Sequence, residues 1–342
     1  MKVFIPKQII FEKGTDNYPI TKQIKTFFQD NPNVLMTEAA PNKVKSLITL
    51  DTIPETYQNG KKTLVVSKKK SSAFQTCKPS ADYMLPLVSG CMGQCEYCYL
   101  HTQLGDKPYM RVHVNIDDIF EKAVNYMNEK PDKITVFEGS ATSDPLCVEP
   151  YTNSLKETIL FFANEPHGSF RFVTKFNDVD TLLGLEHHNK TEIRFSLNTD
   201  YVISNFEHGT ASRDARIHAA SKVMEAEYPV GFLIAPVFLY ETWKQDYKDL
   251  LVQLKNMLPQ HPSHPITFEV ITHRFTPRAK NIIQDIFPDT KLPMEEELRQ
   301  YKHGQFGYCK YVYKKEDMQA VKAFFQTELN NHFPNGIIKY II

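Results

Sequence analysis

Short apolar runs and longer amphipathic stretches alternate along most of the chain. Runs rich in β-branched or aromatic residues, typical of buried strands, lie at 83–90, 133–139, 170–176, 192–199, 228–238 and 265–272. Helical periodicity of the apolar positions fills the intervals, at 114–130, 152–165, 178–188, 212–227 and 241–258. Strands that alternate with helices form parallel sheets, and a one-directional run of such units curls into a barrel. The pattern predicts an α/β fold, a partial (β/α)6 TIM-type barrel.

The two ends of the chain differ from this central pattern. Residues 1 to about 75 show turn-forming segments and no such alternation, so we expect an N-terminal cap there. From residue 299 a period-two pattern of aromatic and basic residues around two glycines predicts a β-hairpin, followed by a helix at 315–331 and a closing strand. We expect one integrated catalytic unit made of a cap at 1–78, a barrel at 79–298 and an extension at 299–342.

Composition and charge limit the location and the partners. The 342 residues are 42% hydrophobic, enough for a large core, and the zero formal net charge by itself favours neither nucleic acid nor an acidic partner. Basic clusters at 68–70, 273–280 and 309–315 are, taken singly, typical of solvated surface. No apolar run approaches the roughly 20 residues that span a bilayer, and the first residues turn polar too early for a signal peptide. We expect a cytoplasmic protein, with a monomer as the default state.

Three of the six cysteines, Cys91, Cys95 and Cys98, lie within eight positions directly after the first barrel strand. In a reducing compartment such a CxxxCxxC group indicates a metal site rather than disulfides. Structural zinc takes four protein ligands, whereas a 4Fe-4S cluster held by three thiolates keeps one iron open for another ligand. A zinc knuckle and a chance cluster of core cysteines are the alternatives. The spacing favours the cluster, because this loop marks enzymes that cleave S-adenosylmethionine reductively.

Polar residues follow the predicted strands where each strand ends. They are Ser143 and Asp144 after the second strand, Lys175 after the third, Ser196 and Asn198 after the fourth, and Arg274 after the sixth. Because the carboxyl ends of parallel barrel strands carry the chemistry in such folds, we expect a polar site at this edge.

The cysteine loop is one of several distinctive segments spread over nearly the whole chain. The others are "KPSADY", "TSD" at 142–144, "RFVTKF", "FSLNTDYVI", "APV", "FEVITHRFTPRAK" and the terminal hairpin. Together they resemble the spore photoproduct lyase family, radical S-adenosylmethionine enzymes that repair the methylene-bridged thymine dimer in the DNA of germinating spores. The resemblance implies a lyase that reverts this lesion to two thymines.

The resemblance also implies two cofactors and the residues that hold them. Cys91, Cys95 and Cys98 would bind a 4Fe-4S cluster, whose open iron chelates S-adenosylmethionine. By the same resemblance, the residues that contact S-adenosylmethionine are Ser143, Lys175 and Ser196 at its amino-acid end, Tyr99, and Ala235 beside the adenine. A lysine and hydroxyl groups at strand ends suit a carboxylate and a ribose.

The repair chemistry needs a hydrogen donor, and here the sequence departs from the family. The resemblance implies that a 5′-deoxyadenosyl radical takes hydrogen from C6 of the lesion, and that a cysteine directly before "TSD" then gives hydrogen to the thymine radical. That position is Ala141 in this chain. Cys77, Cys147 and Cys309 are the candidates for the role, and we favour Cys77 because its segment leads into the cluster strand. Tyr97 and Tyr99 match tyrosines thought to relay the hydrogen back to the cofactor.

The resemblance implies two partners, DNA that contains the lesion and an electron donor of the flavodoxin or ferredoxin type. The residues expected to contact DNA are Gln305, Phe306, Tyr308 and Lys310 of the hairpin, together with Arg274. Family members usually carry Arg and Tyr at the tip where this chain has Gln305 and Phe306. Two alternative functions are a radical enzyme with another substrate and an iron-sulfur module that binds lesions without turnover.

Overall fold

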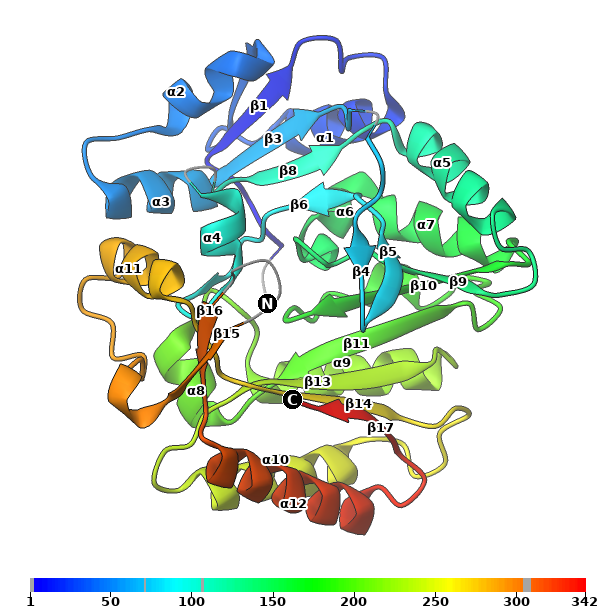
Figure 1. Ribbon diagram of the computed structural model, residues 1–342. Coiled ribbons are helices and arrows are strands. Elements are labelled where there is room, and N and C mark those ends of the chain that lie inside the picture. The colour runs from blue at the N-terminus through cyan, green and yellow to red at the C-terminus, as the bar shows by residue number, and fades with distance from the viewer. Residues whose placement is uncertain (1–2, 71, 106–107, 304–308) are drawn as a thin grey trace. The chain divides into compact units, whose positions relative to one another are not determined.

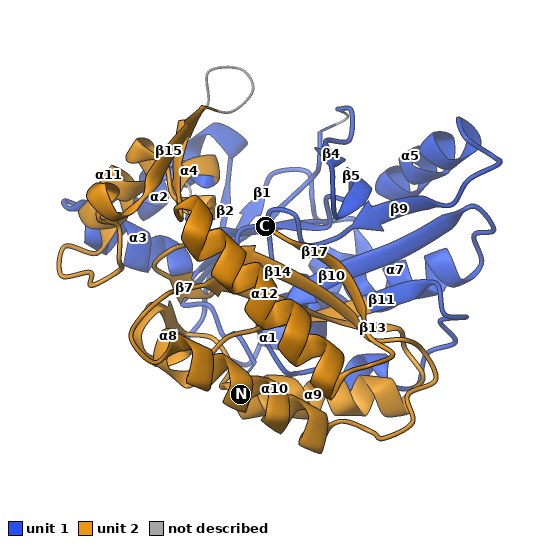
Figure 2. Ribbon diagram, turned by 60° about the horizontal axis from the view of Figure 1, so that its bottom comes forward, with its two compact units in different colours: residues 1–92, 104–192 blue, residues 93–103, 193–342 orange. Residues whose placement is uncertain are grey.

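The structure is a computed structural model that describes residues 3–70, 72–105, 108–303 and 309–342 (Figure 1). It divides into two compact units, one made of residues 1–92 and 104–192 and the other of residues 93–103 and 193–342 (Figure 2). We call them unit 1 and unit 2 and describe each separately. The division at residues 78 and 298 that the sequence suggested stays a prediction.

Unit 1 begins with a small parallel sheet. Its strands β1 (Gln8–Glu12), β2 (Leu35–Ala39), β3 (Thr63–Ser67) and β8 (Met110–His113) have the order β2-β1-β3-β8, and β6 (Val88–Ser89) pairs antiparallel with β8. Helices α1 (Pro19–Phe28), α2 (Val44–Ile48) and α3 (Ile53–Lys61) connect the first three strands. The expectation that residues 1–75 lack strand and helix alternation was therefore wrong. The strands are only five residues long, too short for the period to stand out among the turns.

The second sheet of unit 1 contains the start of the predicted barrel. Strands β5 (Ala81–Met84), β9 (Thr135–Glu138) and β10 (Gly168–Thr174) are parallel, and β4 (Thr76–Cys77) pairs antiparallel with β5. Helices α5 (Ile116–Asn128), α6 (Glu149–Thr152) and α7 (Ser154–Ala163) lie between strands in the chain. Phe162 stacks on Phe170, with ring centroids 5.6 Å apart, and all of both side chains is buried. Burial of these rings stabilises the contact between α7 and β10.

The helix predicted at 178–188 was wrong. This stretch forms only a 3-10 turn at Asp180–Leu182, and His188 and Asn189 adopt left-handed backbone conformations. The buried apolar residues Phe176, Val179 and Leu182 are three positions apart, which is the period of a 3-10 turn and not of an α-helix.

Unit 2 contains the remaining parallel strands. They are β11 (Thr191–Leu197), β13 (Val230–Val237), β14 (Thr267–Thr272) and β17 (Ile337–Ile341), paired in this order. The connecting helices are α8 (Asp200–Phe206), α9 (Arg213–Glu225), α10 (Trp243–Met257) and α11 (Pro277–Ile286). Five of the six predicted barrel strands are thus present, whereas the first one, at 83–90, is divided between β5 and β6, which belong to different sheets. The parallel pairing within each unit agrees with the predicted α/β class.

The C-terminal extension also lies in unit 2. Strands β15 (Gln300–His303) and β16 (Cys309–Val312) are the antiparallel arms of the predicted hairpin, and α12 (Lys315–His332) packs against α10 and β17 (Figure 1). The predicted hairpin arms, helix and closing strand are confirmed. Among the described residues, none of the helices combines the length and the apolar character that crossing a membrane requires.

Candidate active site

The cysteine loop begins in unit 1 at a strained glycine. Gly90 has φ +81°, and a Cβ at this position would lie 2.5 Å from the carbonyl oxygen of Tyr109. The Gly90 amide donates to the carbonyl oxygen of Thr142 at 2.8 Å, and Lys61 Nζ donates to the carbonyl oxygen of Cys91 at 2.7 Å. The backbone of Cys91 is therefore fixed against the loop that carries "TSD".

The other two cysteines of the loop lie in unit 2. Cys95 belongs to β7 (Gln94–Cys95), which pairs antiparallel with β12 (Glu207–His208), and the amide of Cys98 donates to the carbonyl oxygen of Cys95 at 3.2 Å. His101 of α4 (Leu100–Leu104) contacts the same oxygen through Nε2 at 3.0 Å. Tight backbone turns thus shape the loop at this end.

The three thiols fit the donor set of a 4Fe-4S cluster with an open iron. None of the cysteines is in a disulfide, and the CxxxCxxC spacing keeps all three on one short loop whose two ends are held by hydrogen bonds. In the described part of the chain, no three His, Cys, Asp or Glu side chains are grouped to hold a single metal ion.

Asp144 joins the ends of two neighbouring strands in unit 1. Its Oδ1 accepts from the amide of Leu146 at 3.3 Å, and its Oδ2 accepts from Thr174 Oγ1 at 3.0 Å and from the amide of Lys175 at 2.8 Å. This carboxyl group ties the loop after β9 to the end of β10, and so fixes the backbones of Ser143 and Lys175 at one edge. Burial raises the pKa of Asp144 to about 7, against the opposing effect of these hydrogen bonds.

In unit 2, Ser196 and Ala235 lie near the carboxyl ends of adjacent strands. Ser196 of β11 pairs with Leu233 of β13, two positions before Ala235. The Ser196 side chain is buried, whereas Tyr99 is 53% exposed. Asn198 Nδ2 donates to the carbonyl oxygen of Pro236 at 2.8 Å, so the ends of the two strands are held together.

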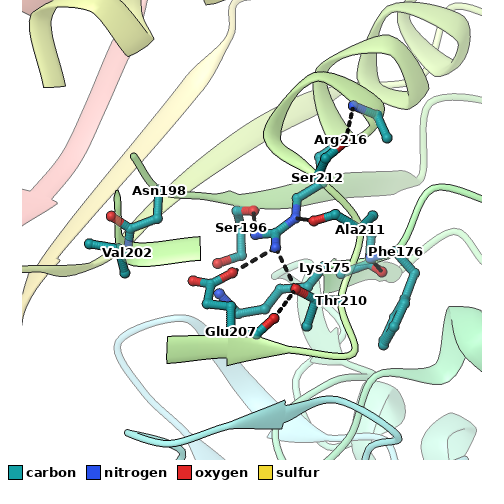
Figure 3. Close-up of polar contacts among 12 residues, drawn as sticks. Lys175, Phe176, Ser196, Asn198, Val202, Glu207, Thr210, Ala211, Ser212 and Arg216 are labelled. Atoms are coloured by element: carbon teal, nitrogen blue, oxygen red, sulfur yellow. Dashed lines mark hydrogen bonds and ion pairs between the residues drawn. The ribbon is translucent and has the colours of Figure 1, made fainter. Parts of the chain in front are cut away.

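Arg216 and Glu207 form a buried ion pair (Figure 3). Glu207 also contacts Tyr97. Arg216 Nη2 lies 2.6 Å from Glu207 Oε2, both side chains are fully buried, and Arg216 also donates to the carbonyl oxygens of Ser196 and Ala211 at 2.9 Å each. Tyr97 donates its phenolic hydrogen to Glu207 Oε1. Burial, and then the charge of Glu207, raise the pKa of Tyr97 well above its usual range. The phenol therefore keeps its hydrogen.

Sequence reasoning missed Glu207 and Arg216. Their only sequence signal is that the two lie nine positions apart after a predicted strand, which is too common a pattern to indicate a buried pair. Arg216 falls on α9 and Glu207 on β12, and only the tertiary fold brings these elements together.

A second polar network in unit 1 links the position of Ala141 to the turn after Cys77. Glu138 at the end of β9 accepts hydrogen bonds from Ser80 Oγ at 3.0 Å and from Ser140 Oγ. Arg171 Nη1 donates to the carbonyl oxygen of Ser80 at 2.7 Å. One carboxylate therefore holds both Ser80, three positions after Cys77, and Ser140, the residue directly before Ala141.

The two other candidate donor cysteines have different surroundings. Cys147 is buried, and its Sγ donates to the carbonyl oxygen of Asp144 at 2.9 Å and lies 3.5 Å from Met110 Sδ. Burial, and then the nearby Cys91, raise the pKa of Cys147 well above its usual range. Cys309 lies on β16 in unit 2, with Sγ 3.3 Å from His303 Nδ1. The hydrogen of Cys147 is thus already committed to a carbonyl oxygen.

Of the residues expected to contact DNA, Arg274 and Lys310 are described and Gln305, Phe306 and Tyr308 lie outside the described residues. Lys310 is half-buried on β16, and Arg274 is exposed shortly after β14. Burial, and then the charges of Arg274 and Lys302, lower the pKa of Lys310. Arg274 and Lys310 therefore lie close enough for their positive charges to repel each other.

Comparison with known proteins identifies relatives over the full length. Residues 4–342 match the family model described as "Spore photoproduct lyase". The chain is 46% identical over 336 residues to spore photoproduct lyase of Clostridium acetobutylicum, and 41% identical over 337 residues to that of Bacillus subtilis. Each alignment covers 98% of both proteins.

Solved structures give the same result for the fold. Spore photoproduct lyase complexed with dinucleoside spore photoproduct matches with a TM-score of 0.96 at 41% identity. A second match is a spore photoproduct lyase mutant in which a cysteine is changed to alanine and a serine to cysteine, with bound AdoMet and the same dinucleoside. Its TM-score is 0.95 and its sequence identity is 42%. Both matches cover 100% of each chain, which confirms the predicted α/β fold, a curled partial TIM-type barrel. The chain belongs to the spore photoproduct lyase family.

Proposed function

We propose that this protein is a radical S-adenosylmethionine lyase that reverts spore photoproduct in DNA to two thymines. The observation that carries the proposal is the family match over residues 4–342, which includes the complete cysteine loop. One relative holds AdoMet and dinucleoside spore photoproduct together, as the proposed reaction requires.

The cofactors would be a 4Fe-4S cluster on Cys91, Cys95 and Cys98, and S-adenosylmethionine. When bound, they supply an electron and a carbon-centred radical that removes hydrogen from C6 of the lesion. The residues that would hold S-adenosylmethionine are Ser143, Lys175, Ser196, Tyr99 and Ala235. In support, Asp144 fixes the backbone of Lys175, and Arg216 fixes that of Ser196.

Cys77 is our proposed hydrogen donor in place of Ala141. After the bridge breaks, a thymine carries an unpaired electron, and Cys77 gives it the hydrogen atom of its S–H bond and becomes a thiyl radical. The S–H bond is weaker than the C–H bond that forms, so the transfer runs downhill. Glu138 supports this choice, because it holds both the turn after Cys77 and the residue before Ala141.

The double mutant among the relatives supports the same choice. Its replaced cysteine and serine are at positions 140 and 76 of that protein, 64 apart. Ala141 and Cys77 are likewise 64 positions apart in this chain. This chain carries an alanine and a cysteine with that separation.

Tyr97 and Tyr99 are the proposed relay that returns hydrogen to the thiyl radical. A tyrosine suits this step because its O–H would supply one hydrogen atom to the thiyl radical, and the phenoxyl radical left behind would regain one from 5′-deoxyadenosine, which returns the unpaired electron to the cofactor. The contact with Glu207, whose charge Arg216 balances, supports the assignment of Tyr97 only by fixing the position of the phenol.

DNA that contains the lesion is the proposed partner, contacted by Arg274, Lys310 and the hairpin residues Gln305, Phe306 and Tyr308. We further propose an electron donor of the flavodoxin or ferredoxin type, a monomeric state and a place in the cytoplasm of a spore-forming cell. Relatives in Clostridium acetobutylicum and Bacillus subtilis support the last point.

The test is turnover of the reconstituted protein with dithionite, S-adenosylmethionine and dinucleoside spore photoproduct, followed by chromatography of the products. We expect thymine to form. Formation of 5′-deoxyadenosine without thymine would contradict the substrate and favour another one. Absence of both products in a protein that contains iron and sulfide would favour a lesion-binding module.

A further inference from the structure

A basic groove lies in unit 2 between the hairpin and α12. It has a volume of about 600 Å³, and the cations that line it are Arg274, Lys302, Lys310, Lys315 and Lys322. No Asp or Glu side chain is among its lining residues. In the part of the chain that the structure describes, none of these five cations is in an ion pair with a carboxylate side chain. The side chains that line the groove therefore concentrate positive charge.

The hairpin arms contribute two lysines in direct opposition. Lys302 of β15 and Lys310 of β16 are cross-strand partners in the antiparallel ladder. Like charges directly opposite each other destabilise a sheet. The Lys302–Lys310 pair is therefore electrostatically unfavourable. An anion bound in the groove would turn this repulsion into a net attraction.

Helix α12 presents the other wall of the groove. Lys315, Met318, Gln319 and Lys322 follow the spacing of one helical face, and all four line the groove. Met318 Sδ accepts from Thr272 Oγ1 at 3.4 Å, which holds this face against the end of β14. Since β11, β13 and β14 are parallel, the groove opens at the strand edge that carries Ser196 and Ala235.

The shape of this charge favours a repeating polyanion over a single phosphate. Lys315 and Lys322 are seven residues apart, about 10 Å along the helix axis. That distance equals about three nucleotide steps at 3.4 Å per strand. A free phosphate would use only a small part of the groove.

We propose that this groove binds the phosphodiester backbone of the DNA strand that flanks the lesion. Lys302, Lys315 and Lys322 would extend the DNA contact beyond Arg274 and Lys310, to nucleotides that are not repaired. The inference rests on the proposed function, because it concerns the same DNA substrate. It predicts that the groove provides a large part of the affinity for DNA. Dinucleoside spore photoproduct has no flanking phosphates and should therefore not use the groove.

The experiment compares two charge-matched double variants, K315Q/K322Q in the groove and K248Q/K255Q on α10. All four lysines are exposed and each variant loses two positive charges, but Lys248 and Lys255 do not line the groove. Binding of a lesion-free 20-base-pair DNA duplex is measured by fluorescence anisotropy from 50 to 300 mM NaCl. The groove variant should reduce the magnitude of the negative slope of log K against log[NaCl] by about 2. It should also weaken binding roughly ten- to thirtyfold near 0.15 M salt.

The control variant should keep the slope of the unmodified protein. Equal slopes for the groove variant and the unmodified protein would overturn the proposal. It would also be overturned if a duplex RNA bound more tightly than the DNA duplex and lost more affinity than the DNA in the groove variant. If K315Q/K322Q does not fold by circular dichroism, K302Q tests the other wall and should lower the slope by about 1.

Turnover of the dinucleoside separates this inference from the proposed function. K315Q/K322Q should repair it at the rate of the unmodified protein, and loss of that repair with unchanged DNA binding would overturn the groove as a flanking site. If the unmodified protein repairs no dinucleoside, the proposed function fails, whereas the binding measurement still decides whether the groove binds DNA.

Discussion

At the scale of single residues, the chemistry depends on which side chain can release a hydrogen atom. Alanine at 141 has none to give, and the S–H of buried Cys147 is directed at a backbone oxygen. Cys77 is half-buried beside a turn that Glu138 holds. The proposed donor role therefore falls to Cys77, and Glu138, the carboxylate that holds the turn after Cys77, lies at the end of β9.

Exchange of the donor position tests this assignment. Cys77→Ala should lower the yield of thymine per 5′-deoxyadenosine severalfold, because the thymine radical then reacts with other groups, and Ala141→Cys in the same chain should restore clean repair. The products are quantified by chromatography. Cys309→Ala is the control and should repair normally. Clean repair by Cys77→Ala alone would contradict the role of Cys77.

At the scale of elements, polar groups at strand ends fix the loops that carry the site. Asp144 joins the loop after β9 to the end of β10, and Gly90 lets the cysteine loop pass close to Tyr109. Such contacts need specific backbone conformations, and a left-handed φ with no room for Cβ is strained for any residue except glycine.

Substitution of Gly90 tests how strongly this conformation supports the loop. Gly90→Ala should lower the free energy of unfolding by about 1–3 kcal/mol and reduce the iron content of the reconstituted protein, because the new Cβ would meet a backbone oxygen. Urea unfolding and iron analysis measure the two effects. Gly184→Ala is the matched control, since a Cβ there meets nothing within 4 Å, and it should change stability by less than about 0.5 kcal/mol. Equal stability of the two variants would contradict the strain at Gly90.

At the scale of the whole molecule, a formal net charge of zero conceals strong local imbalance. Cations gather without Asp or Glu side chains among the residues that line the groove beside α12, whereas Arg216 with Glu207 and Arg194 with Glu269 form buried pairs. His113 in unit 1 is buried near Lys69 and Arg111. Burial, and then these two cations, lower the pKa of His113 to about 3.

The lowered pKa of His113 predicts a loss of stability in acid. Because the unfolded chain binds a proton at His113 near pH 6.5 and the folded protein does not, the free energy of unfolding should fall by about 1.4 kcal/mol per pH unit between pH 6.5 and 3. His113→Gln removes this contribution, so relative to the unmodified protein it should gain about 2 kcal/mol between pH 6.5 and 5. Urea unfolding at each pH measures the difference. His218→Gln, an exposed control, should show no such gain, and a pH-independent difference for His113→Gln would exclude this histidine as the cause.

Much of the fold could be predicted from local patterns, because apolar periodicity reflects the geometry of the backbone. Five of the six barrel strands, α12 and the hairpin arms were found in this way, as was the cysteine loop by its spacing, whereas the strand predicted at 83–90 is divided between two sheets. The pattern failed at residues 1–75, where strands of five residues are too short to show a period, and at 178–188, where a period of three was taken for a helix.

The sequence by itself determined the family, the CxxxCxxC loop proposed to bind the cluster and the missing cysteine at position 141, since these depend only on residue identity and spacing. The tertiary structure decided which residues act together. Glu138 joins Ser80 and Ser140, Glu207 pairs with Arg216, and Lys302 faces Lys310 beside α12. The physical reason is that charges and hydrogen bonds act between side chains a few ångströms apart in space, and only the packing of distant elements sets those distances.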